Sequence, residues 1–79
     1  MKTEDALSKI EQVFREVFDD PKLEIREDTI PSDLPLWDSL THIHLVMSLE
    51  EAFNIQFTSA EIITVNRVGD LVTAIRRHV

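Results

Sequence analysis

A hydroxyl and a carboxylate stand side by side near the middle of the chain, where a polar stretch gives way to an apolar helical pattern. Asp38 and Ser39 form this pair, and His42 and His44 follow within five residues. Serine, histidine and aspartate are the residue types of nucleophilic hydrolysis, and histidine is also a common metal ligand. A serine at the start of a helix can instead cap that helix or serve as an attachment point.

A serine hydrolase is disfavoured because the chain lacks the rest of such a site. A triad needs an oriented base and an oxyanion hole, and the turn that exposes a catalytic serine normally contains glycines. The only glycine is Gly69, far along the sequence. His42 and His44 are two residues apart and point to different sides of a helix, which disfavours a metal site. We therefore expect no catalytic residue, no metal ligand and no enzyme, with His42 partly packed and His44 on the surface.

Two interpretations of Ser39 remain. An exposed serine at a helix N-terminus faces free backbone N–H groups and the positive end of the helix dipole, both of which favour an anion. A phosphodiester on Ser39 would carry its charge there at low cost, and Asp38 would offer a carboxylate to a metal ion or a basic residue of a modifying enzyme. Alternatively, one of the two residues simply caps the helix, as both residue types do well. Local chemistry alone favours the cap.

Apolar residues recur at three- and four-residue spacing through much of the chain, which predicts helices. A capping box, Thr58 with Glu61, marks the start of one of them. The predicted helices cover residues 4–18, 39–53, 58–64 and about 66–78. The expected fold is all-α: a small four-helix bundle with three principal helices and one short helix, in a single domain over residues 1–79.

A long loop over residues 19–38 joins the first two helices and contains all three prolines of the chain. A loop of this length is unusual in a compact domain, and its apolar residues are scattered, so we expect it to pack across helices. Trp37 is expected to anchor its end. The second helix is predicted to bury one apolar stripe, formed by Leu45, Val46, Leu49 and Phe53.

Charge narrows the possible partners. Fifteen acidic residues against eight basic ones give a formal net charge of −7. Such a surface repels phosphate backbones and anionic lipids, so we expect no nucleic acid and no membrane insertion. It attracts proteins with basic patches, although excess acid also serves merely to keep a small protein in solution. The absence of cysteine fits a cytoplasmic protein, which we expect to be monomeric.

The residues around Ser39 resemble the acyl carrier protein family, in which the serine of an Asp-Ser-Leu motif opens the second helix. An aliphatic run ending in Leu-Glu-Glu-x-Phe follows there. The matching segments here are Trp37-Asp38-Ser39-Leu40, Leu45 to Phe53, then Ile55, Phe57 and Glu61, and Val68-Gly69-Asp70-Leu71-Val72. The resemblance implies 4′-phosphopantetheine, transferred from coenzyme A to Ser39 by a phosphopantetheinyl transferase. An acyl group would then ride as a thioester on the arm, so that a chain without cysteine could take part in thioester chemistry.

The resemblance also implies that the second helix docks acyl-loading and acyl-processing enzymes that have basic patches. The residues that carry over as partner contacts are Leu40, Met47, Glu50 and Glu51. Leu36 stands where many family members have glycine, and Thr41 and His44 stand where housekeeping members often have acids. These departures favour a specialised pathway, with fatty acid, polyketide and related chemistry all open. The alternative is an unmodified, small, acidic helical interaction module.

Overall fold

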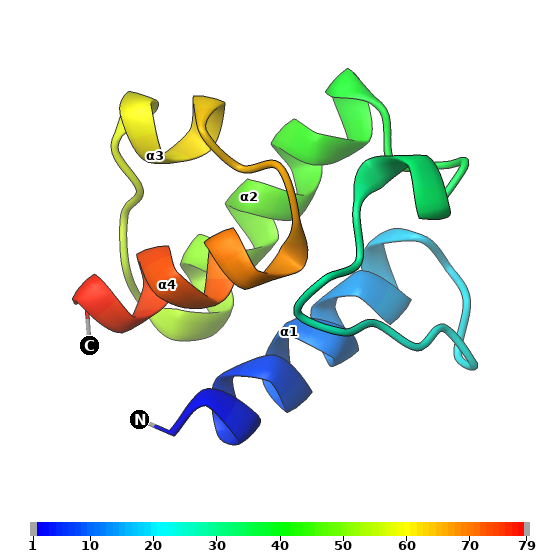
Figure 1. Ribbon diagram of the computed structural model, residues 1–79, viewed down its shortest axis with the longest axis horizontal. Helices are drawn as coiled ribbons and strands as arrows, with labels where there is room; N and C mark the ends of the chain where they lie inside the picture. Colours follow the sequence, from blue (N-terminus) through cyan, green and yellow to red (C-terminus); the bar gives the residue numbers. More distant parts are fainter. Residues whose placement is uncertain (1, 79) are drawn as a thin grey trace.

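The computed structural model in Figure 1 describes residues 2–78, apart from the side chain of Thr3. This part of the chain forms four α-helices and one short 3-10 helix. The elements are α1 (Thr3–Val17), η1 (Pro31–Asp33), α2 (Ser39–Phe53), α3 (Ser59–Ile63) and α4 (Val68–His78). Residues 2–78 contain no strand, which confirms the predicted all-α bundle of three principal helices and one short helix. Each helix begins and ends within two residues of its predicted bounds.

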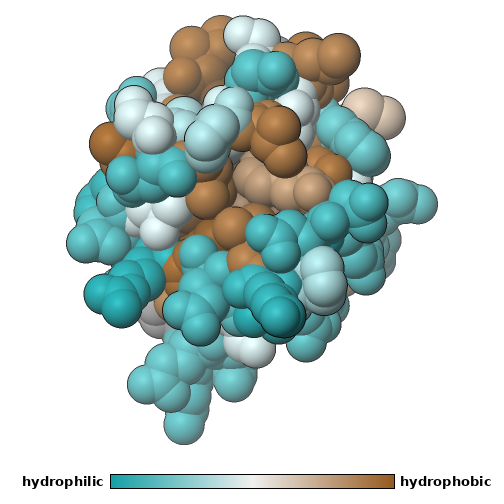
Figure 2. Space-filling view, turned by 90° about the vertical axis from the view of Figure 1, so that its right-hand side faces the viewer, coloured by the Kyte–Doolittle hydropathy of each residue, from teal (hydrophilic) through white to brown (hydrophobic). Residues whose placement is uncertain are grey.

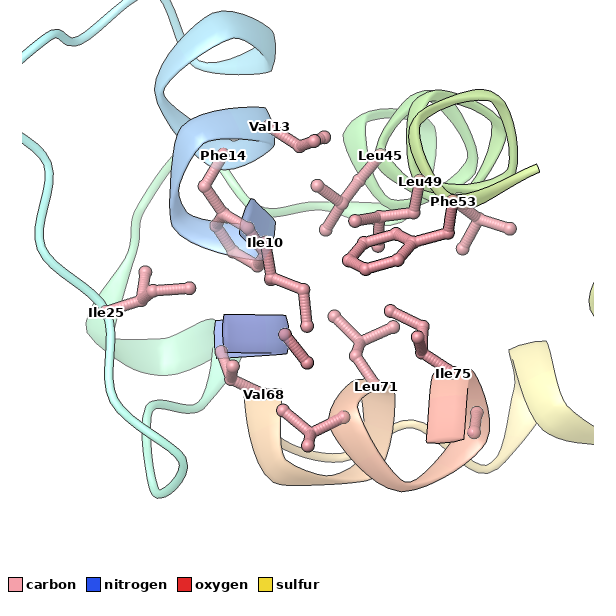
Figure 3. Close-up of a cluster of buried hydrophobic side chains, with 14 of the residues drawn as sticks. Ile10, Val13, Phe14, Ile25, Leu45, Leu49, Phe53, Val68, Leu71 and Ile75 are labelled. Carbon is pink, nitrogen blue, oxygen red and sulfur yellow. The ribbon is translucent and has the colours of Figure 1, made fainter. Parts of the chain in front are cut away.

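Side chains of α1, α2 and α4 meet in one hydrophobic core (Figure 3). The largest side chains that are essentially fully buried are Ile10 and Phe14 of α1, Leu45 and Leu49 of α2, and Val68, Leu71 and Ile75 of α4. All four residues of the stripe predicted on the second helix are buried, as expected. Burying one large apolar side chain stabilises the fold by about 1.5–3 kcal/mol, so this core holds the three principal helices together.

Local hydrogen bonds fix the ends of α2 and α3. The Asp38 carboxylate accepts the backbone N–H of Thr41 at 2.9 Å at the start of α2. The predicted capping box of α3 is present: Thr58 accepts the Glu61 N–H at 3.1 Å, and the Glu61 carboxylate accepts the Thr58 N–H at 2.9 Å. Asn54 directly follows the last residue of α2 and adopts a left-handed conformation with φ of 55°. Asparagine tolerates this conformation better than most residues, so the chain can leave the helix there.

The long loop between α1 and α2 packs across helices, as predicted. Ile25 is buried in the core, and two loop carbonyls bind the first turn of α4. Val68 donates its N–H to the Thr29 carbonyl at 2.9 Å, and Gly69 donates to the Glu27 carbonyl at 2.7 Å. A Cβ atom at Gly69 would lie 3.0 Å from that same Glu27 oxygen, so the only glycine of the chain permits this close approach.

Candidate functional site

Ser39 is the first residue of α2, and its side chain is exposed. Within the described residues, its hydroxyl makes no hydrogen bond. Asp38, directly before it, has extended backbone angles and supplies the side-chain cap. The two roles that local chemistry left open are therefore divided: Asp38 caps the helix, and the Ser39 hydroxyl is left available.

The Asp38 carboxylate is held in one orientation. Its Oδ1 atom accepts both the backbone N–H and the side-chain hydroxyl of Thr41, each at 2.9 Å. These bonds, the backbone bond most of all, lower the pKa of Asp38 below its ordinary value, because they stabilise the charged form. A fixed and exposed negative charge therefore lies directly beside the Ser39 backbone.

Trp37 anchors the end of the loop behind Ser39, as predicted. It is 5% exposed, and its ring meets the Phe14 ring of α1 edge to face at a centroid distance of 5.3 Å. The indole N–H donates to Nδ1 of His42 at 3.1 Å, and Nε2 of His42 lies 3.2 Å from the backbone oxygen of Ile62. The expected partial packing of His42 is confirmed, but its bridge to α3 was not predicted. No local spacing points to a carbonyl twenty residues further along the chain.

A surface hollow of about 500 Å³ adjoins Ser39, between the start of α2 and the end of α3. Apolar side chains form much of its wall: Ile43 from α2, Ile62 and Ile63 from α3, and Val65 just beyond. The buried Trp37 and the half-buried His42 also line the hollow. Sequence patterning did not reveal this hollow, because its walls come from segments that are far apart in the chain.

Large apolar side chains are exposed around the start of α2. Their exposed fractions are 62% for Leu36, 78% for Leu40, 56% for Ile43, 60% for Met47 and 79% for Ile63. Figure 2 shows apolar side chains over the upper part of one face, at the height where α2 begins, and hydrophilic ones over the lower part. Leu40 and Met47 were named from sequence, whereas Ile43 was not. Ile43 lies in a helix with regularly spaced apolar residues, and in such a pattern an isoleucine is normally expected in the core.

The two predicted glutamate contacts differ in their surroundings. Glu51 is exposed on α2. Glu50 is half-buried, and its carboxylate accepts the backbone N–H of Phe57 at 2.8 Å, which fixes the connector between α2 and α3. Glu50 therefore has a structural contact that the sequence did not reveal.

Comparison with known proteins places this chain in a family. The family model described as "Phosphopantetheine attachment site" matches residues 8–75. The chain belongs to the acyl carrier protein family. Its structure is similar to the solution NMR structure of the holo acyl carrier protein from Geobacter metallireducens, with 34% sequence identity and a TM-score of 0.86, over 92% of this chain and 84% of that chain. Comparison with the curated proteins gives no match.

Membership of this family makes the chain a carrier protein and not an enzyme, and the group that such carriers hold covalently is 4′-phosphopantetheine. Among the described residues, no group of three or more histidine, aspartate and glutamate side chains is placed to hold a metal ion. No helix in that part of the chain is long and apolar enough to cross a membrane.

Proposed function

We propose that Ser39 is the attachment site of the 4′-phosphopantetheine arm and that the chain delivers acyl groups, held as thioesters on that arm, to partner enzymes. In the transfer, the Ser39 oxygen loses its proton and forms a bond to a phosphorus of coenzyme A. The pyrophosphate bond breaks, and adenosine 3′,5′-bisphosphate leaves. The observation that carries the proposal is that the Ser39 hydroxyl, at the N-terminus of α2, is exposed and makes no hydrogen bond within the described residues.

The surroundings of Ser39 fit such a group. An anion near a helix N-terminus is stabilised by about 0.3–1 kcal/mol, which suits a phosphodiester at the first residue of α2. The apolar wall of the hollow, which includes Ile43 and Ile62, offers a surface against which an acyl chain can pack. Each CH₂ group that the chain buries there stabilises the packed state by about 0.8 kcal/mol. Asp38, exposed and ionised, is available to a metal ion or a basic side chain of the transferase.

The docking surface that we propose consists of Leu40, Ile43, Met47 and Glu51 on α2. Its three apolar residues are more than half exposed, which is costly unless a partner covers them at times. The net charge of −7 steers the chain toward the basic patches of a phosphopantetheinyl transferase and of acyl-loading and acyl-processing enzymes. Thr41 and His44 make this surface less acidic, which favours a specialised fatty acid, polyketide or related pathway.

The alternative, an unmodified interaction module, requires Ser39 to serve only as a helix cap. Asp38 already fills that role, since its carboxylate accepts the Thr41 N–H. The free hydroxyl of Ser39 then has no structural task, which favours the carrier function.

Intact-mass measurement after incubation with coenzyme A and a broad-specificity transferase tests the proposal. We expect one phosphopantetheine on the wild type and none on Ser39→Ala. Ser59→Ala is the matched control, because Ser59 is also an exposed serine at the first position of a helix, α3, and should leave modification unchanged. An unmodified wild type, under conditions that convert a known carrier completely, would refute the proposal.

A further inference from the structure

His42 connects three parts of the chain at the hollow beside Ser39. It lies on α2, three residues after Ser39, and both residues line the hollow. Its ring stacks on Trp37 at a centroid distance of 6.0 Å, with 30° between the planes. Its two ring nitrogens contact the Trp37 indole N–H and the Ile62 backbone oxygen. The His42 side chain on α2 therefore links the loop to α3.

The two hydrogen-bond partners select one tautomer of the neutral His42 ring. An indole N–H can only donate a hydrogen bond, so Nδ1 of His42 must be the acceptor and carry no proton. A carbonyl oxygen can only accept, so Nε2 must carry the proton and donate to Ile62. Only the neutral ring with its proton on Nε2 makes both bonds. A protonated ring keeps the bond to Ile62 and loses the bond to Trp37.

The helix on the far side of the hollow depends on few contacts. None of the five residues of α3 is fully buried, and its packing against the core is limited to the partly buried Ile62. Side chains from α2 and α4 also bind it: His42 contacts the Ile62 oxygen, and His78 of α4 contacts the Glu61 carboxylate at 2.9 Å. Ile62 and Ile63 belong to the wall of the hollow, so the contact to Ile62 also positions that wall.

We propose that His42 is a positioning residue that holds α3 and Trp37 against the turn carrying Ser39 and so keeps the hollow closed enough to shelter a short acyl chain. This inference rests on the proposed attachment at Ser39. The acyl chain is sheltered only while His42 is neutral, so the shelter weakens when His42 is protonated or replaced.

The charged groups around His42 are few. Directly before α2, Asp38 lines the same hollow. On α3, Glu61 is next to Ile62, but its carboxylate is bound by the Thr58 N–H and by His78 of α4. The loop contributes Pro31 and Trp37, which are uncharged. From α1, the uncharged Phe14 ring packs against Trp37.

The indole N–H of Trp37 reports the first bond directly, because the chain has one tryptophan. In the unmodified protein we expect hydrogen exchange of this N–H to be about five- to tenfold faster in His42→Phe, the factor that one net hydrogen bond gives. His42→Asn keeps an acceptor at the δ position and should resemble the wild type, whereas His42→Gln places its amide at the ε position, leaves the δ position without an acceptor and should resemble His42→Phe. His44→Phe, at an exposed position on the same helix, is the control. Wild-type exchange in His42→Phe would overturn the inference.

Wild-type protein tests the same point without a substitution. We expect the Trp37 indole proton resonance to shift in step with protonation of the His42 ring, as followed by NMR of the ring. The shift should be absent in His42→Phe and unchanged in His44→Phe. An indole resonance that does not follow the His42 ring in the wild type would overturn the inference.

The shelter itself is measured on protein loaded with hexanoyl-phosphopantetheine by a broad-specificity transferase. Cleavage of the thioester by hydroxylamine should be about fivefold faster in His42→Phe than in the wild type or His44→Phe. Intact mass first shows whether loading has occurred, so a failure at Ser39 is distinguished from a failure at His42. Complete loading with equal cleavage rates in all three proteins would overturn the role of His42 and leave the attachment site intact.

Discussion

Replacing Glu50 by alanine tests whether this residue stabilises the fold in addition to any contact with partners. Its carboxylate accepts the backbone N–H of Phe57 at 2.8 Å, and Phe57 is 8% exposed. Within residues 2–78, this N–H has no other acceptor. Removing the carboxylate leaves a donor without a partner, and a hydrogen bond to a charged group contributes about 1.5–3 kcal/mol. A domain of this length has a free energy of unfolding of about 4–12 kcal/mol, so the loss is a large fraction of the total.

Urea denaturation followed by circular dichroism measures this loss. Glu51→Ala is the matched control, because Glu51 is the next residue, has the same charge and is exposed; we expect a change of less than about 0.5 kcal/mol. Glu50→Gln keeps a neutral acceptor and should recover about half of the loss, since charge-assisted bonds are roughly twice as strong. Equal stability of Glu50→Ala and Glu51→Ala would refute the structural role of Glu50.

Three further outcomes follow from the structure. Hydrogen bonds, chiefly one from a backbone N–H in each case, lower the folded-state pKa values of Asp38 and Glu61. The stability that these two carboxylates contribute is complete above their unfolded-state pKa values and is lost as the pH falls through their folded-state values. The urea midpoint should therefore drop in acid, and it should drop less in the Asp38→Asn/Glu61→Gln double variant. Gly69→Ala should reduce the free energy of unfolding by about 1–3 kcal/mol, because the new Cβ meets the Glu27 oxygen; an unchanged midpoint would contradict this. Met47→Glu should change stability by less than about 0.5 kcal/mol, since Met47 is exposed, but lower turnover by the partner enzyme; equal turnover would refute its place on the docking surface.

The helices could be predicted from sequence because their signals are local. Apolar spacing, the Thr58–Glu61 capping box and the prolines of the loop each act within a few residues, and the structure places the helices where these signals predict them. The start of α4 shows the limit of such signals. The Asp70 carboxylate accepts the backbone N–H groups of Asn66 and Arg67, and the helix begins only at Val68.

The hydrogen bonds that join distant segments could not be predicted, because nothing in the local sequence selects one partner among many. His42 was expected to be partly packed, but its contact with a carbonyl of α3 was not predicted. Glu50 was expected on the surface beside Glu51, yet it binds the connector after α2. The hollow beside Ser39 depends on the same long-range contacts. The exposed position of Ser39 at the start of α2 was predictable, because Asp38, the residue that caps the helix, is its neighbour in sequence.

The most direct test of the central claim is peptide-level mass spectrometry of the protein purified from the cells that produce it. Fragmentation of the peptide that contains Ser39 should locate one phosphopantetheine on that serine, and the mass of the loaded arm should identify the acyl group. Unmodified Ser39 throughout, or a phosphopantetheine on any other residue, would contradict the attachment site proposed for this carrier.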